Sequence, residues 1–453
     1  MAESMRWEQL MVDSRLCSHG KSSLGPVRTS FQVDADRITF SNAFRRLQGK
    51  TQVYPLPEDD HVHTRLTHSL EVASAGRSIG NLVGEAVLER QPELAGSISF
   101  RDLGDCVHAA CLAHDLGNPP FGHSGEQAIR SWFEAWMERS PRAAELNPAQ
   151  RADLTTFEGN AQGFRLLTSQ DRGGRKGGLQ LTHATLAAFT KYPRGSGSAA
   201  EQATYKGKSV AKLGEYQAEW GAFQEVTAAV GLLPRQGYPG AWCRHPLAFL
   251  VEAADDICYL ILDLEDGHRL GYLPHDLYVD LMEPIAARHG SFSGRGPDDD
   301  STDARRAYGG VLRAMAVGTL IQEAARTFID HEEAILRGEM DRSLTSCMSL
   351  KPHLDRIERE SIRYCYQARE VVEIELVGFQ VLGALLDRFV TAALHPERCV
   401  SGKLRTLFPW IGGHGEVYAD LLACTDYISG MTDSYAVSLY RRLAGHSLPG
   451  RSR

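Results

Sequence analysis

An adjacent histidine and aspartate, followed by a histidine–glutamate pair, give this sequence its strongest indication of chemistry. His114 and Asp115 are neighbours, and His123 and Glu126 follow a break rich in glycine and proline, residues 117–122. A neutral imidazole beside a carboxylate offers two ligands to a divalent metal. The break ends one helix and turns the chain, and a second helix begins soon after it, with Glu126 in its first turn. The stretch therefore predicts a metal-binding pair followed by an acid–base pair that faces the same space.

An isolated His-Asp pair is a weak signal, because most such pairs form hydrogen bonds at helix ends. A metal site therefore requires ligands from elsewhere in the chain. The apolar spacing predicts a long helix over residues 65–88, in which Arg65 and His68 share a face. His68 is the candidate for the third ligand. His61 and His63 lie in the polar segment before this helix and are expected to face solvent.

The helix that must position His114 is predicted over residues 100–116. Leu103, Val107, Ala110 and His114 fall on one helical face, so His114 points the way the buried face points. A polar side chain at the inner end of an apolar face needs a partner. A metal is one such partner, and a hydrogen-bonded core histidine is the alternative.

A second apolar helix, predicted over residues 245–270, carries acidic residues. Asp255, Tyr259 and Asp263 are spaced four apart and lie along one stripe. Acids in so apolar a helix are unfavourable unless they are paired, and an ion or ligand would explain them. Asp256 lies about 100° round the helix and is expected to make a structural hydrogen bond.

Together these residues form a constellation of two nitrogen and two oxygen ligands from three helices. It consists of His68, His114, Asp115 and one acid of the stripe that includes Asp255. This donor set fits Mn²⁺ or Fe²⁺, and Mg²⁺ or Zn²⁺ remain possible.

Several basic residues precede and follow this constellation. Arg37, Arg45, Arg46 and Lys50 form a cluster that is either a solvated face or, beside a metal, a phosphate-binding group. The Gly-, Ser- and Lys-rich segment 195–212 is predicted to be a mobile loop that closes over an anion.

Composition bounds the class of protein. Hydrophobic residues make up 43% and charged residues 23% of 453 residues, which is typical of a globular chain. A net charge of −8 argues against a surface that coats nucleic acid as a whole, but not against a local basic patch. Nine scattered cysteines without a Cys-x-x-Cys pair indicate reduced thiols. With no apolar leader and no apparent membrane span, we expect a cytoplasmic protein.

The pattern of elements predicts an all-α fold with a small β-hairpin insertion, its turn at residues 171–178. The expected organisation is an N-terminal tether (1–30), a core that holds the metal and substrate site (31–275) and a helical C-terminal region packed on that core (276–453).

Seven motifs resemble those of HD-domain phosphohydrolases and, more narrowly, of the bacterial deoxyguanosinetriphosphate triphosphohydrolase (dGTPase) family. The resemblance is close over residues 28–270 and rests on position alone over residues 280–400. The motifs occupy residues 44–53, 64–72, 113–126, 157–162, 190–193, 252–259 and 431–436.

The resemblance implies a large helical HD fold, and it selects Asp255 as the acid that joins His68, His114 and Asp115 as a metal ligand. It also implies that His123 and Glu126 form a catalytic dyad. The substrate contacts that we carry over or expect are Arg65, Lys191 and Lys212 for the triphosphate, Gln52 and Asp263 for the sugar 3′-hydroxyl, Tyr259 for exclusion of a 2′-hydroxyl, and Asn160 and Tyr192 as further contacts.

The implied reaction is attack of water on the α-phosphorus of a dNTP, most of all dGTP, giving deoxynucleoside and tripolyphosphate. A divalent metal, Mn²⁺ or Mg²⁺, and the cations would neutralise charge on the phosphoryl oxygens, while His123, oriented by Glu126, handles the proton. The resemblance also implies a homo-oligomer, a hexamer, that responds to nucleotides or single-stranded DNA, with no membrane partner.

Two alternatives stay open. One is another HD phosphohydrolase, such as a nucleotidase or a cyclic-nucleotide phosphodiesterase. The other is a non-catalytic nucleotide-sensing or nucleic-acid-binding HD module, which would be marked by loss of a ligand or of the His123–Glu126 pair. No such loss occurs in this sequence.

Overall fold

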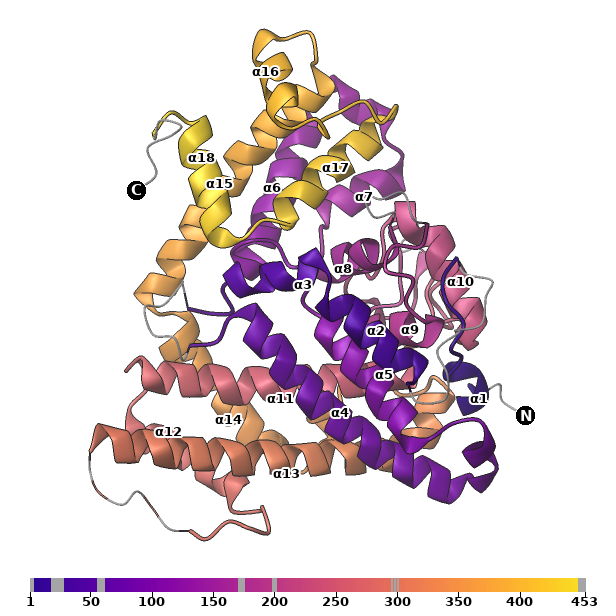
Figure 1. The fold of residues 1–453 in the computed structure, drawn as a ribbon, viewed down its shortest axis with the longest axis vertical. Helices are drawn as coiled ribbons and strands as arrows, with labels where there is room; N and C mark the ends of the chain where they lie inside the picture. The colour runs from indigo at the N-terminus through magenta and orange to yellow at the C-terminus, as the bar shows by residue number, and fades with distance from the viewer. Residues whose placement is uncertain are drawn as a thin grey trace.

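The computed structural model describes residues 4–17, 28–54, 62–169, 176–197, 202–294, 296, 299 and 301–446. Over these ranges the regular elements are helices, joined by turns and isolated β-bridges, which confirms the all-α prediction (Figure 1). A π-helical segment, Ile362–Tyr366, also occurs. In chain order the α-helices are α1 (Trp7–Leu10), α2 (Ser30–Thr39), α3 (Asn42–Arg46), α4 (Arg65–Arg90), α5 (Phe100–Ala113), α6 (Gly122–Arg139), α7 (Pro148–Thr155), α8 (Gly159–Thr168), α9 (His183–Phe189), α10 (Trp220–Val230), α11 (Pro246–Arg269), α12 (His275–Ala286), α13 (Thr302–Leu336), α14 (Lys351–Ser361), α15 (Arg369–Leu394), α16 (Cys399–Leu407), α17 (Val417–Ser429) and α18 (Asp433–Leu443).

The predicted β-hairpin is not supported. Its turn falls partly on residues 171–175, which lie outside the described ranges. The apolar run before the turn, ending at Leu167, is the last part of helix α8 and not a strand. After the turn, Thr182 makes only an isolated bridge with Arg15. Short apolar runs fit a helix or a strand equally well, which is why the pattern misled the prediction.

The two helices that begin and end near the predicted metal ligands are packed unusually closely. Helix α4 starts with a capping box in which Thr64 and Thr67 satisfy each other's backbone N–H groups. A Cβ on Gly80 of α4 would lie 2.8 Å from Cα of Gly104 in α5, so only glycine permits this approach. The result is a tight α4–α5 pair, side by side at the centre of the molecule (Figure 1).

Two apolar cores lie on either side of the site. The first contains side chains from α4, α5, α11 and α13, such as Ile79, Val107 and Ile257. The second contains side chains from α6, α15, α17 and α18, such as Phe133 and Phe389. In Figure 1 the helices of the second core occupy the upper part of the molecule and those of the first core the lower part. The break between α5 and α6 crosses from one core to the other.

Among the residues that the structure describes, one helix, α15, is long and apolar enough by length and composition to cross a membrane, whereas the sequence analysis expects no such segment. Half of the most apolar 18-residue stretch of α15 is buried, and the helix packs against α6 and α17. A core helix of a globular protein can have the same length and apolar composition, so α15 is only weak support for a membrane span.

Candidate active site

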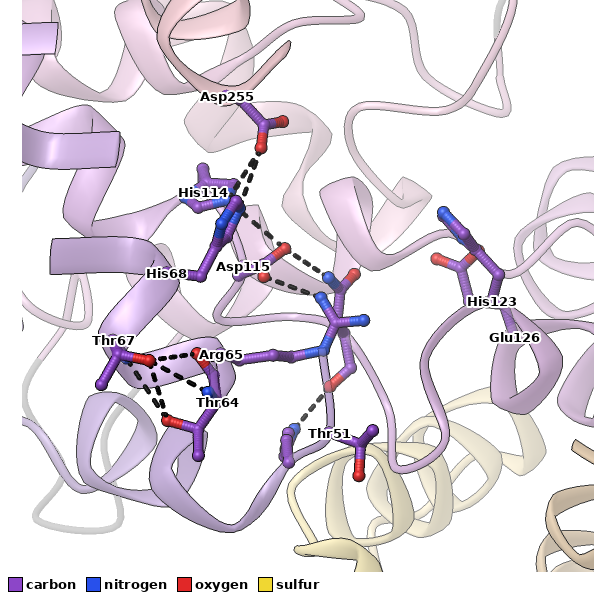
Figure 2. Close-up of polar contacts among 12 residues, drawn as sticks. Thr51, Thr64, Arg65, Thr67, His68, His114, Asp115, His123, Glu126 and Asp255 are labelled. Atoms are coloured by element: carbon purple, nitrogen blue, oxygen red, sulfur yellow. Dashed lines mark hydrogen bonds and ion pairs between the residues drawn. The ribbon is translucent and has the colours of Figure 1, made fainter. Parts of the chain in front are cut away.

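The α4–α5 pair brings two of the predicted ligands together. His68 lies one turn into α4, and His114 is the residue at which α5 ends. Their rings are 5.3 Å apart between centroids, edge to face. Both side chains are almost completely buried and point toward helix α11, as Figure 2 shows.

Asp255 of α11 completes a group of three ligands. Its Oδ1 atom lies 3.2 Å from Nε2 of His68 and 3.3 Å from Nε2 of His114. One ligand atom from each of the three residues lies within 4.8 Å of the others. The fourth predicted ligand, Asp115, is adjacent, with Oδ1 3.6 Å from Nε2 of His114. The structure thus brings all four predicted residues to one place.

The hydrogen bond that orients the His114 ring suits a metal ligand. Its Nδ1 donates to the carbonyl of Cys111 at 2.7 Å, which leaves Nε2 with a lone pair in the neutral ring. This Nε2 atom is buried and lacks a partner in hydrogen-bond geometry. A buried polar atom without a partner is unfavourable, and a divalent cation among the two imidazoles and two carboxylates would satisfy it. The residues present therefore fit a metal.

The electrostatics of the cluster favour a cation. Burial opposes ionisation of Asp115, but the nearby Arg65 guanidinium outweighs it and holds the pKa of Asp115 well below its usual range. Burial likewise opposes ionisation of Asp255, and Lys191 and His114 outweigh it, so that its pKa is also lowered. Both carboxylates therefore stay charged around neutral pH.

A sharp reversal of the chain places the second pair of residues. Phe121 has a left-handed backbone with φ of 63°, and Gly122 follows at 56°. Helix α6 begins at Gly122, two residues earlier than the start near Ser124 that the sequence predicts. A Cβ on Gly122 would lie 2.7 Å from the Arg65 guanidinium, so glycine is needed for space as well as for φ.

His123 and Glu126 form a hydrogen-bonded dyad on the first turn of α6. Nδ1 of His123 donates to Oε2 of Glu126 at 3.1 Å, and the backbone N–H of Gly159 donates to Oε1 at 2.7 Å. The His123 side chain is 81% exposed, whereas Glu126 is 5% exposed. Burial opposes ionisation of Glu126, but the bond from His123 leads the effects that outweigh it and lower its pKa. Nε2 of His123 is thus left free to exchange a proton.

The dyad and the metal cluster open into one cavity of about 430 Å³. This volume is within the range of small-molecule sites. In Figure 2 the dyad lies across from the three-ligand cluster, with Arg65 extending between them. The predicted site residues that line the cavity are Gln52, Arg65, His68, His114, Asp115, His123, Glu126, Asn160, Lys191, Tyr192, Lys212, Asp255 and Tyr259.

Each cation of the cavity has a carboxylate partner. Arg65 donates to Asp115 at 2.7 Å. Lys212 lies 3.4 Å from Glu158. The described part of the lysine-bearing segment 195–212 brings Lys212 to the cavity wall, and the mobility of this segment and its closure over an anion stay predictions.

Asp263 is the predicted site residue that does not line the cavity. It is 1% exposed and accepts a hydrogen bond of 3.0 Å from the hydroxyl of Tyr366. Tyr366 in turn stacks on Tyr259, with 5.6 Å between ring centroids. Asp263 therefore lies behind a layer of two tyrosines, and burial raises its pKa.

The cavity also has lining residues that the sequence analysis missed. They include Lys208 of the α9–α10 connection, Glu252 of α11, Tyr366 of the π-helical segment and Glu375 of α15. Lys208 belongs to the predicted anion-binding loop and Glu252 to one of the seven motifs, so both residues could have been predicted from the sequence. Tyr366 and Glu375 fall in the region matched by position alone, which carried no signal of its own.

Three further predictions concern residues near the site. Asp256 accepts a bond of 2.7 Å from the Thr345 hydroxyl, which confirms its structural role. The prediction that His63 faces solvent is wrong, because it bonds Asp266 at 2.8 Å and Glu71 at 3.2 Å. His61 lies outside the described residues.

The basic cluster around Lys50 does not line the cavity. Lys50 is buried and donates to the carbonyls of Asn118 and Ser429, and Arg37 donates to the carbonyl of Leu179. These two cations therefore bind main-chain oxygens, and their contacts do not support the phosphate-binding alternative.

Comparison with known proteins agrees with this geometry. The HD domain model matches residues 65–147, which span His68, His114 and the dyad. A Synechocystis sp. protein named deoxyguanosinetriphosphate triphosphohydrolase-like is 46% identical, over 98% of this chain and 100% of the relative. A Pseudomonas aeruginosa protein of the same name is 40% identical, over 98% and 100%. The Yersinia enterocolitica deoxyguanosinetriphosphate triphosphohydrolase is 30% identical, over 91% and 93%.

The all-α fold, the cluster of histidine and aspartate ligands and the match to the HD domain model together define an HD phosphohydrolase. This is a class of metal-dependent hydrolases. Within that class, the chain belongs to the deoxyguanosinetriphosphate triphosphohydrolase family.

Proposed function

We propose that this protein is a metal-dependent dNTP triphosphohydrolase whose preferred substrate is dGTP. It converts a deoxynucleoside triphosphate and water to deoxynucleoside and tripolyphosphate. The observation that carries the proposal is the shared cavity, in which the metal cluster, the His123–Glu126 dyad and the amines of Lys191 and Lys212 meet. The names of the relatives support a dNTP as the substrate class.

The metal would be held by His68, His114, Asp115 and Asp255, with Mn²⁺ or Mg²⁺ as the first candidates and Fe²⁺ or Zn²⁺ also compatible with the donors. When bound, it supplies Lewis-acid neutralisation of charge on the phosphoryl oxygens.

The protein's own cations bind the triphosphate. Arg65, Lys191 and Lys212 already project into the cavity, each paired with a carboxylate that keeps it extended. Phosphate oxygens can replace or share these partners, because charge-assisted bonds to phosphate are of similar strength. Asn160 and Tyr192 would add polar contacts from the same wall.

His123 moves the proton of the reaction. Glu126 occupies Nδ1, so Nε2 is the atom that exchanges a proton between the attacking water and the departing 5′-oxygen. The bond between the α-phosphorus and the 5′-oxygen breaks as the bond from water to phosphorus forms. Exposure of His123 toward the cavity leaves room for the substrate beside it.

The sugar would lie against Gln52 and Tyr259. Oε1 of Gln52 is buried without a hydrogen-bond partner, as a site for a substrate hydroxyl would be before binding. The ring of Tyr259, which lines the cavity, would pack against the sugar and exclude a 2′-hydroxyl. Asp263 would act through Tyr366, whose hydroxyl it holds.

A product assay tests the proposal. The purified protein is incubated with each dNTP and with GTP, plus Mn²⁺ or Mg²⁺, beside its His114→Ala variant. Tripolyphosphate and deoxynucleoside from the wild type alone are expected. Release of orthophosphate or pyrophosphate would mean that a different bond is cleaved, and it would favour another HD phosphohydrolase such as a nucleotidase or phosphodiesterase. Binding of nucleotide without turnover, also in the presence of single-stranded DNA or mixed dNTPs, would favour a sensor.

The hexameric assembly, control by nucleotides or single-stranded DNA, the cytoplasmic location and the three-part division at residues 30 and 275 stay predictions.

A further inference from the structure

A carboxylate from the C-terminal region holds two loops of the active site at once. Asp433, the first residue of α18, accepts the backbone N–H of Thr51 on Oδ2 at 2.9 Å and that of Phe121 on Oδ1 at 3.0 Å. Asp433 is 2% exposed, so both bonds are shielded from water. Figure 2 shows the pale yellow ribbon of the C-terminal region passing below Thr51.

Lys50 makes a second connection between the same three segments. Its Nζ donates to the carbonyl of Asn118 at 2.5 Å and to the carbonyl of Ser429, at the end of α17, at 2.7 Å. The turn between α17 and α18 also touches Gly49, where a Cβ would lie 2.7 Å from Cγ2 of Thr432. The turn, residues 429–433, is therefore seated against both loops.

The two loops carry groups that the proposed reaction needs. Thr51 precedes Gln52, and the carbonyl of Lys50 accepts the backbone N–H of Arg65 at 3.2 Å. Phe121 leads directly into the turn of α6 that carries His123. A left-handed backbone is unfavourable for a residue other than glycine, and the bond from its N–H to Asp433 helps to hold Phe121 in this conformation.

We infer that Asp433 is a positioning residue for the active site. Its two carboxylate oxygens fix the position of the His123–Glu126 dyad relative to the cavity wall that includes Gln52 and Arg65. This inference rests on the proposed function for its kinetic readout. Asp433 bonds none of the four metal ligands directly: its partners are Thr51, which precedes α4, and Phe121, which lies further along the same loop as Asp115.

The isosteric variant Asp433→Asn tests the inference, because an amide keeps one acceptor and turns an N–H₂ group toward the other backbone N–H. Asp153→Asn is the matched control. Asp153 is 1% exposed and accepts the N–H of Gln217 at 3.0 Å and the hydroxyl of Tyr418, and neither partner lines the cavity. Three readouts are used: steady-state kinetics, Mn²⁺ affinity by electron paramagnetic resonance, and hydrogen–deuterium exchange by mass spectrometry.

For Asp433→Asn we expect kcat to fall by about tenfold or more and KM to rise several-fold, with Mn²⁺ affinity unchanged. Peptides that contain Thr51 and Phe121 should exchange faster. Asp153→Asn should lower the melting temperature without changing kcat or exchange in those peptides. Kinetics of Asp433→Asn that match the control, or unchanged exchange at both loops, would overturn the inference.

The exchange readout separates the two proposals. If the wild type hydrolyses no dNTP, the proposed function fails, while faster exchange at Thr51 and Phe121 in the variant still supports the positioning role. If Asp433→Asn does not fold, Asp433→Ser keeps a single acceptor on a shorter side chain. It is expected to protect one of the two loops only, and protection of both would contradict the inference.

Discussion

Lys191 and Asp255 are joined by a contact of 2.5 Å between Nζ and Oδ2, on the side of the carboxylate away from His68 and His114. One carboxylate therefore faces the metal cluster with one oxygen and a substrate-side cation with the other. For Lys191→Met we expect KM for the nucleotide to rise by about tenfold or more. Mn²⁺ affinity should be equal or higher, because a competing positive charge is removed. A titration with Mn²⁺ beside steady-state kinetics measures both, and lost Mn²⁺ affinity with unchanged KM would contradict a substrate-side role.

Asp255 and Asp256 are neighbours in sequence with different surroundings, and they form a matched pair of variants. Asp255→Asn should weaken Mn²⁺ binding by about 10- to 100-fold, because a charged ligand becomes a neutral amide. Asp256→Asn should change Mn²⁺ affinity only a few-fold, since this carboxylate bonds Thr345. Isothermal titration with Mn²⁺ decides the matter, and equal losses in the two variants would count against the assigned ligand.

The dyad should affect turnover and not metal binding. We expect His123→Asn to lower kcat by about 10²- to 10⁴-fold, the usual contribution of a general acid–base group. Glu126→Gln should have a smaller effect, because its amide oxygen can still accept from Gly159 while the charge that orients His123 is lost. Single-turnover kinetics at saturating Mn²⁺ give both values. Near-normal turnover of His123→Asn would assign the proton transfer to another group.

His63 should make stability depend on pH. Burial opposes its charged form, but the hydrogen bonds that His63 donates to Asp266 and Glu71 outweigh burial and raise its pKa to about 10 from an ordinary value of 6.5. The charged pair therefore stabilises the fold fully below pH 6.5, and this contribution is lost as the pH rises from 6.5 through 10. We expect His63→Asn to lower the free energy of unfolding by about 2 kcal/mol at pH 6 and by less at pH 10.

Urea unfolding at pH 6, 8 and 10 measures this difference. His395→Asn is the control, because His395 is 40% exposed and pairs with the exposed Glu397. Such surface pairs contribute about 0–1 kcal/mol, so little change is expected at any of the three pH values. A His63→Asn difference that grows with pH would show that the histidine is neutral in the folded protein.

Local sequence pattern was sufficient for the residues that one helix places. The apolar face of α5 indicated that His114 points inward, and the stripe of α11 indicated Asp255, and both lie in the cluster. The same stripe does not bring Asp263 to the cavity wall, because eight residues advance about 80° beyond two full turns. Asp263 has rotated away from the cavity and lies behind Tyr366, a partner 103 positions later that no local pattern indicates.

Contacts between distant segments account for the remaining differences. The polar neighbours of His63 predict a solvent-exposed side chain, but its partner Asp266 is 203 positions away. Asp433 belongs to a recognised motif, yet its bond to Phe121 spans 312 positions, and its connection to the site could be seen only in the folded chain. Periodicity reports the face of a helix but not which distant group meets that face.

The division of the site between two apolar cores has a mechanical consequence. His68, His114 and Asp255 are attached to helices of the first core and the dyad to α6 of the second, and Asp115 lies in the break that joins them. Loosening of the second core, even far from the substrate, should therefore shift His123 and Glu126 more than His68, His114 and Asp255. Turnover and metal affinity in this protein can therefore change independently. A substitution in the second core can lower turnover while the affinity for the metal ion stays high.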